Sequence, residues 1–277
     1  MINTGSPLAV LMASLVVCAS GDVVANERHH SAKATYISTK VRSSDKQAWI
    51  SAIINDDTTK LSRLLDLGNS TSLIQITASN GKSALMVATK TGDLVLAERL
   101  VVAGASVNEL TETQGTPFMF AILGGHRDVA QWLLDQGADI NTVGSNGWSA
   151  LTISAAKGQV PLLQWLISEG AYAQLRDVYR FTPLLRAVEN GHIEAAAVLL
   201  SLVDTDVNAR DESENTALHH AVASRNTALV NLLLEHSANP QLLNRKGKSP
   251  MDMARALASD SETLLHAMES NLAPDNP

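Results

Sequence analysis

The stretch from Asn146 to Gln174, NGWSALTISAAKGQVPLLQWLISEGAYAQ, decides the fold because versions of it recur along the chain. Its hydroxyl residue, Ser149, belongs to a series of Ser and Thr residues spaced by 33, 33, 33, 34 and 33 positions. The other members of the series are Ser83, Thr116, Thr182, Thr216 and Ser249. A fixed period in this range is typical of a solenoid built from stacked supersecondary units.

Each copy predicts two short helices. Thr116 and Thr182 are good N-cap residues, and a proline follows each at the first helical position, where its missing amide is not needed. Glycines then predict the ends of both helices, because glycine adopts left-handed backbone angles without a steric penalty. The first helix ends at Gly92, Gly125, Gly158 and Gly191, and the second at Gly104, Gly137 and Gly170. Helices this short are marginal alone, so the stability must come from stacking.

Two joints depart from the pattern. Asp204 and Thr205 stand where Gly-Ala is expected, in the copy with the 34-residue spacing, and Ser237 replaces the same glycine in the next copy. Aspartate tolerates left-handed angles better than most residues. We therefore expect both joints to be less regular than the others.

These residues resemble the ankyrin repeat, most closely at 116–141 and 146–174. The resemblance covers roughly residues 80–268, and a degenerate copy extends it back to about residue 45. It implies an all-α solenoid of about six to seven helix–loop–helix repeats with projecting hairpin-like loops, here assigned to residues 45–268. It also implies partner binding as the usual role, and no reaction or cofactor.

The N-terminus predicts an exported bacterial protein. Leu8 to Ala19 form an apolar run that is too short to span a bilayer and suits a secretory signal, so we assign residues 1–25 to a signal peptide cut after Ala25. No Lys or Arg precedes the run, which leaves a hydrophobic leader on a cytoplasmic protein as the alternative. In a third interpretation, Leu15 to Cys18 form a lipoprotein box, and Cys18 carries a lipid anchor. Residues 26–44 then form a flexible polar leader, and residues 269–277 a disordered tail.

Charge and histidine placement argue against several functions. The net charge is −7, and no face gathers a basic stripe, so we do not expect a nucleic-acid partner. His219 and His220 are adjacent, and adjacent helical residues point too far apart to share a metal as an i, i+4 pair does. His126 and His192 fall where ankyrin repeats commonly carry Gly-His. We therefore predict no catalytic residue, no metal site, no cofactor and no membrane span.

The partner-binding residues are predicted from two positions of each repeat. In the ankyrin architecture, the concave face is formed by loop tips, just before the hydroxyl landmark, and by first-helix residues four positions after it. Aromatic and Arg side chains at such positions are typical of interfaces. The predicted contact residues are Trp148, Phe181, Tyr179, Phe120, Ile153 and Arg186. By contrast, Trp132 and Trp165 share one second-helix position and are expected in the core.

These observations predict a non-enzymatic module that binds a protein partner in the bacterial periplasm. The alternative is an enzyme, or an enzyme-associated accessory or inhibitor subunit, that uses polar residues of the concave groove. Because the solenoid takes up nearly the whole mature chain, we expect no separate catalytic domain.

Overall fold

A computed structural model describes residues 41–67, 70–257 and 262–270. The predicted signal peptide, Cys18, most of the polar leader and residues 271–277 of the tail lie outside these ranges. The N-terminal copy consists of α1 (Ser43–Ile54), α2 (Thr58–Leu65) and the short α3 (Ser70–Leu73). Helix α1 therefore includes the last two residues that the sequence analysis assigned to the leader, Ser43 and Ser44.

In the described part of the chain, six helix pairs follow the first copy, in the order the sequence predicts. The first helices of the pairs are α4 (Ala84–Thr91), α6 (Pro117–Gly124), α8 (Ala150–Ala156), α10 (Pro183–Glu189), α12 (Ala217–Ala223) and α14 (Pro250–Ala256). The second helices are α5 (Leu94–Val102), α7 (Arg127–Asp135), α9 (Val160–Ser168), α11 (Ile193–Leu200), α13 (Thr227–Glu235) and α15 (Glu262–Ser270). Helix α15 includes Glu269 and Ser270, which the sequence analysis placed in the tail.

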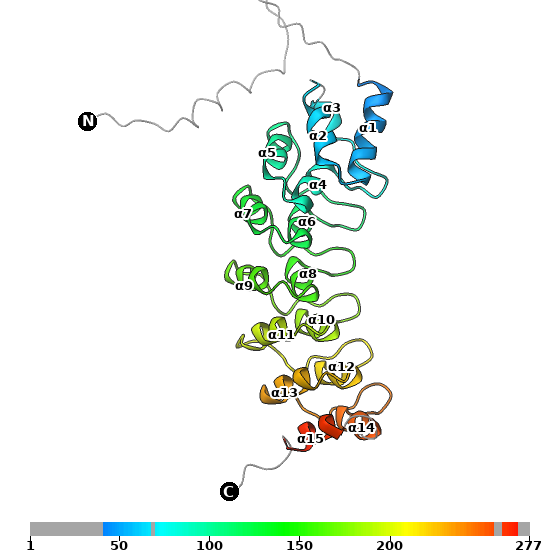
Figure 1. Cartoon of the computed structure of the whole chain (residues 1–277), viewed down its shortest axis with the longest axis vertical. Helices are drawn as coiled ribbons and strands as arrows, with labels where there is room; N and C mark the ends of the chain where they lie inside the picture. The colour runs from blue at the N-terminus through cyan, green and yellow to red at the C-terminus, as the bar shows by residue number, and fades with distance from the viewer. Residues whose placement is uncertain (1–40, 68–69, 258–261, 271–277) are drawn as a thin grey trace, which may run out of the picture. The chain divides into compact units, whose positions relative to one another are not determined.

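The pairs stack as layers, with each first helix packed on the next first helix and on its own second helix. In Figure 1 the first helices form one column, the second helices a column beside it, and the loops project on the other side. No strand forms within the described ranges, where an isolated bridge joins Val143 to Ser149 across one loop. The predicted all-α solenoid is confirmed.

All six hydroxyl landmarks begin a first helix. In the α6 layer the Thr116 side chain accepts a hydrogen bond from the Met119 amide at 3.2 Å, and Pro117 follows at the first helical position. Thr216 and Ser249 form capping boxes. In each box the cap hydroxyl accepts from the amide three residues on, and the side chain of that residue accepts from the amide of the cap residue. These bonds satisfy amides that have no partner inside the helix.

A glycine follows four of the first helices, α4, α6, α8 and α10, and lies close to the next layer. Gly158 has φ +63°, and a Cβ added there would lie 2.5 Å from Nδ1 of His192 in the following layer. Nε2 of His192 donates to the carbonyl oxygen of Ala156, at 3.0 Å. His192 therefore joins two layers, which confirms its structural placement, and Gly92 lies against His126 in the same way.

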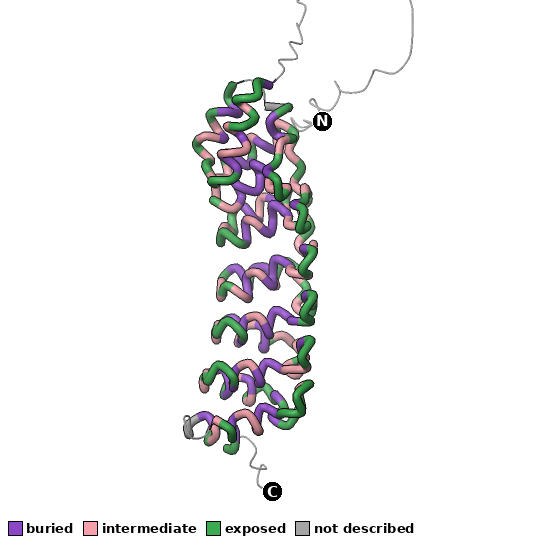
Figure 2. Tube along the Cα trace, turned by 90° about the vertical axis from the view of Figure 1, so that its right-hand side faces the viewer, coloured by how far each residue is buried: buried purple, intermediate pink, exposed green. Residues whose placement is uncertain are grey.

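Buried residues recur in layer after layer of the stack, as the purple segments of Figure 2 show. One second-helix position is buried in successive layers and holds Leu100, Leu133, Leu166, Leu199 and Leu233. Trp165 is also buried, as predicted. Trp132 is partly buried and packs against both core clusters, so it links the N-terminal cluster to the larger C-terminal one.

The 34-residue joint is irregular in a different way from the one expected. At the other joint, Ser237 takes left-handed angles with φ +64° and its amide bonds to Leu234 as a glycine amide does, so the expected irregularity there is wrong. In the 34-residue joint, Asp204 does not take left-handed angles. Instead the Thr205 hydroxyl donates to the carbonyl oxygen of Leu199 at 2.6 Å and caps the end of α11. Asn108 and Asn141 each donate a side-chain bond to the glycine carbonyl of the next joint, and Gln174 replaces this asparagine before the irregular joint.

Candidate functional site

The loops and first helices together form one face of the stack, which we call the groove face. It carries three of the predicted contact residues around one apolar pocket of about 360 Å³. Phe120, Trp148 and Ile153 line this pocket and are all partly exposed. Met119 and Leu123 of α6 add apolar surface, and Thr113, Ser145 and Asn146 supply polar groups from the loops. We call this site the apolar pocket.

Phe181 does not lie in the exposed strip that the sequence analysis predicted. Its exposed fraction is 8%, because its ring is covered from two sides. The guanidinium carbon of Arg186 lies 4.1 Å from the ring centroid, and the ring of His220, from the next layer, lies at 5.3 Å. The expected exposure of Phe181 is therefore wrong. Tyr179, in the same loop, is 57% exposed as expected.

Arg186 is held in place by several groups. Its Nε donates to Asp177 Oδ2 at 2.9 Å, and its Nη1 donates to Glu189 Oε2 at 2.7 Å. The guanidinium also lies 5.1 Å from the centroid of the Trp148 ring. Asp177 has a fully buried side chain, and its other oxygen accepts bonds from the amides of Tyr179 and Phe181. Arg186 therefore neutralises a buried carboxylate, and little of it remains accessible to a partner.

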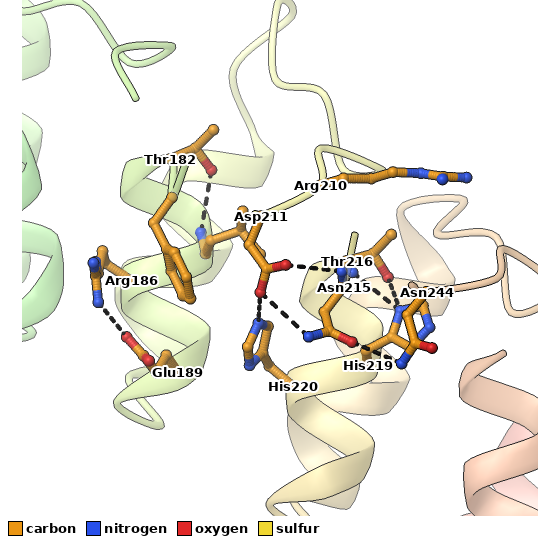
Figure 3. Close-up of polar contacts among 12 residues, drawn as sticks. Thr182, Arg186, Glu189, Arg210, Asp211, Asn215, Thr216, His219, His220 and Asn244 are labelled. Carbon is orange, nitrogen blue, oxygen red and sulfur yellow. Dashed lines mark hydrogen bonds and ion pairs between the residues drawn. The ribbon is translucent and has the colours of Figure 1, made fainter. Parts of the chain in front are cut away.

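The next layer contains a second carboxylate in the same repeat position. Figure 3 shows Asp211 facing His220, and Asp211 Oδ2 lies 2.9 Å from His220 Nε2. Asn215 donates to the same oxygen at 3.4 Å, while its own side-chain oxygen accepts from Asn244 Nδ2 at 2.9 Å. These polar groups satisfy one another, which connects the loops of two adjacent layers.

His219 has a different role from that of its neighbour. Its Nδ1 accepts from the Thr216 amide at 3.0 Å, and its Nε2 donates to the Lys248 carbonyl oxygen at 3.0 Å. Burial lowers the pKa of His219 below its ordinary value. In the following layer, hydrogen bonding from the backbone and hydroxyl of Ser249 lowers the pKa of Asp252. Both side chains complete helix caps, which gives them a structural role.

No metal-binding constellation appears in the part of the chain that the structure describes, where no three His, Cys, Asp or Glu residues are placed to hold an ion. None of the described helices has the length and apolar character needed to cross a membrane.

The sequence analysis missed a basic cluster at the C-terminal end of the groove face. Arg245, Lys246 and Lys248 line a pocket of about 470 Å³, together with Ser213, Asn215, His220, Asn244 and Met253. We call this site the basic pocket. The run Arg245-Lys246-Gly247-Lys248 was the available signal, and it lies in one loop rather than in a stripe along the repeats.

Comparison with known proteins places the same repeats in a family. Sequence profiles of ankyrin repeats match residues 49–144 and 140–211, and a further ankyrin-repeat profile matches residues 202–254. The ankyrin repeat domain of human ASB11 superposes with a TM-score of 0.68 and 22% identity, over 85% of this chain and 100% of that domain. The ankyrin repeat domain of Bcl-3 superposes with a TM-score of 0.63 and 25% identity, over 80% and 97%.

Two curated relatives are each similar to a short segment of this chain. Palmitoyltransferase ZDHHC17 of Danio rerio is 41% identical over 75 residues, which are 27% of this chain and 12% of the relative. The putative ankyrin repeat protein YahD of Escherichia coli is 35% identical over 77 residues, 26% of this chain and 38% of the relative. The chain thus spans well under half the length of either relative, and the similarity carries no whole-protein activity with it.

Proposed function

Because this chain belongs to the ankyrin-repeat family, we propose that it is a non-enzymatic module that binds a protein partner on the groove face. The observation that carries this proposal is the apolar pocket formed by Phe120, Trp148 and Ile153. A cluster of partly exposed aromatic and aliphatic side chains is the usual centre of a protein interface. The pocket volume is at the low end of the roughly 300–1,000 Å³ that ligand sites occupy, which suits an apolar side chain of the partner.

The polar residues of the groove face support a binding function over a catalytic one. Asp177 is engaged by Arg186, Asp211 by His220, and His219 by a helix cap. A general acid or base must reach a substrate proton, and these groups are occupied by contacts that hold each loop and helix cap in place. An enzymatic role would therefore require the loss of structural contacts.

A photo-crosslinking residue placed at position 120 tests this proposal. Phe120 should be replaced by benzoylphenylalanine in the full chain, and the protein expressed in its native host. We expect a discrete crosslinked protein adduct, identified by mass spectrometry. The matched control has the same residue at Val95, an exposed position on α5 on the other side of the stack. Equal adducts from both positions, or none from position 120, would contradict binding on the groove face.

We also propose that the protein is exported to the bacterial periplasm. The support is the apolar run from Leu8 to Ala19, followed by small or branched residues before Asn26. Intact-mass measurement on protein purified from its native host provides the test, with a mature chain beginning at Asn26 as the expected result. A lipid-sized mass increment on Cys18 would indicate a lipoprotein instead. A soluble cytoplasmic form that retains residues 1–25 would contradict export.

A further inference from the structure

Within the described ranges, the basic pocket gathers three cations that form no ion pair inside the protein. The side chains of Asn215 and His220 bond to Asp211, and Asn244 donates to Asn215, so the carboxylate beside the pocket is already engaged in hydrogen bonds. Among the described residues, Arg245, Lys246 and Lys248 form no ion pair with any carboxylate. All three are exposed at the loop of the last layer.

This arrangement is unusual for a chain with a net charge of −7. Two other cations of the groove face pair with carboxylates, since Arg186 binds Asp177 and Glu189 and Arg210 lies 3.4 Å from Glu214. Three adjacent uncommitted cations create a local positive potential on an otherwise acidic protein, which attracts and orients an anionic group of a partner.

We infer that the partner segment bound by the apolar pocket also carries acidic residues, which the basic pocket binds through Arg245, Lys246 and Lys248. This inference rests on the proposed function, because it names the chemistry of the same partner. The two pockets lie three layers apart, between α6 and α8 and between α12 and α14. At roughly 10 Å per helical layer the separation is about 30 Å, which an extended chain covers in about nine residues.

The same observations favour a protein segment over a nucleic acid. A polyphosphate backbone is bound by cations distributed along a groove, with aromatic side chains on which bases stack. The basic pocket has three cations in one loop, Glu212 lies in the neighbouring loop, and no Phe, Tyr or Trp side chain lines the pocket. A short run of Asp or Glu residues matches this local charge.

Peptide selection tests the inference even though the natural partner is unidentified. Random sixteen-residue peptides displayed on phage are selected against the full chain, and the tightest binder is measured as a fluorescein-labelled peptide by anisotropy. We expect selected peptides to carry an apolar residue and, about nine residues away, a pair of Asp or Glu residues. Arg245→Glu combined with Lys246→Glu should weaken binding of this peptide and raise its Kd by about tenfold.

Two controls separate this effect from net charge. Lys46→Glu combined with Lys60→Glu makes the same charge change at the other end of the stack, and it should alter Kd by less than about twofold. Replacing the acidic residues of the peptide by Gln or Asn should weaken binding to the wild type as much as the double reversal does. In the Arg245→Glu, Lys246→Glu variant, the same replacement in the peptide should not weaken binding any further.

The possible failures are distinguishable. Selected peptides that lack acidic residues, yet lose binding on Phe120→Ala, would overturn this inference and leave the proposed function standing. Recovery of no binding peptide would contradict both. A thymidine oligonucleotide of sixteen nucleotides that displaces the peptide and binds as tightly as the peptide does would overturn the inference in favour of nucleic acid.

Discussion

The N-terminal and C-terminal halves of the groove face use one backbone frame but contrasting side chains. In the loops before α4, α6 and α8, the fifth residue before each cap is Ala78, Thr111 or Gly144. The residue four positions after the cap in these layers is Val87, Phe120 or Ile153. In the loops of α10 and α12 the corresponding pairs are Asp177 with Arg186 and Asp211 with His220. We call the layers of α4, α6 and α8 the apolar half, and the layers of α10 and α12 the polar half.

One backbone requirement explains both solutions. The amide just before each cap needs an acceptor, and in the α6 layer Thr111 Oγ1 accepts from the Gly115 amide at 2.8 Å. In the α8 layer, where position 144 is glycine, Asn146 accepts from the Trp148 amide at 3.1 Å instead. Asp177 does the same for the Phe181 amide at 2.9 Å. A carboxylate leaves a second oxygen that needs a donor, and Arg186 or His220 supplies one nine residues on, whereas a hydroxyl or amide allows an apolar residue there.

Arg186→Met is expected to have the largest effect, because it leaves the buried Asp177 carboxylate without its cation. Removing one partner of a buried pair costs about 3–5 kcal/mol of unfolding free energy. Urea unfolding of the full chain, followed by circular dichroism, measures the loss. The Asp177→Asn, Arg186→Met double variant imitates the Asn244 and Met253 pair of the last layer and should recover most of it.

The same experiment can break the comparison between the halves. If the double variant unfolds at the same urea concentration as Arg186→Met, the stability lost in Arg186→Met does not come from an unpaired Asp177 carboxylate. The link between the loop residue and the residue nine positions later would then be coincidental.

Leu166→Ala and Trp148→Ala separate the stacked core from the apolar half of the groove face. Leu166 is completely buried, so its truncation should cost roughly 2–5 kcal/mol of stability. Trp148 is partly exposed at the pocket, so Trp148→Ala should weaken binding of a selected peptide by on the order of 2 kcal/mol. Its effect on stability should be smaller than that of Leu166→Ala. A melting temperature lowered equally by both variants would place Trp148 in the core.

Gly137 and Ser237 compare the same joint in the two halves. Gly137 has φ +89° and nothing within 4 Å of an added Cβ, so Gly137→Val should cost roughly 1–3 kcal/mol through backbone strain alone. Ser237 already holds a side chain at φ +64°, and Ser237→Val should cost less. The measurement is the urea midpoint of each variant, and equal shifts would contradict the assigned repeat register.

The positions of the helices and loops could be predicted from the sequence. The exposure of the side chains on the groove face could not. Thr116, Pro117 and Gly125 act on backbone a few residues away, so their effect is local and visible in the sequence. The burial of Phe181 depends on Arg186 and on His220 of the next layer, and neither contact follows from the pattern of one repeat. The basic pocket was missed because charges were counted over the chain, not placed on one loop. The partner-binding roles of the groove residues remain predictions.

The smallest expected effect is a pH dependence confined to the polar half. Its Thr216 cap relies on Nδ1 of His219 as an acceptor, and protonation would place a second donor against the Thr216 amide. Burial lowers the pKa of His219, while the His220 and Arg210 charges lower it and Asp211 and the Lys248 carbonyl raise it. The unfolded chain therefore binds this proton more readily. The contribution is present above the ordinary pKa of 6.5 and is lost as the pH falls below it.

His219→Gln isolates this contribution, because an amide can accept from Thr216 and donate to Lys248 without titrating. We expect the unfolding free energy of the variant to fall less between pH 7 and pH 5 than that of the wild type. Glu109, whose pKa burial raises, acts in the opposite direction in both proteins and cancels in the difference. His236→Gln, at an exposed position, is the control and should keep the wild-type slope. If the unfolding free energy of His219→Gln falls between pH 7 and pH 5 as much as that of the wild type, His219 contributes no pH dependence. The caps of the polar half would then be no more sensitive to acid than the hydroxyl caps of the apolar half.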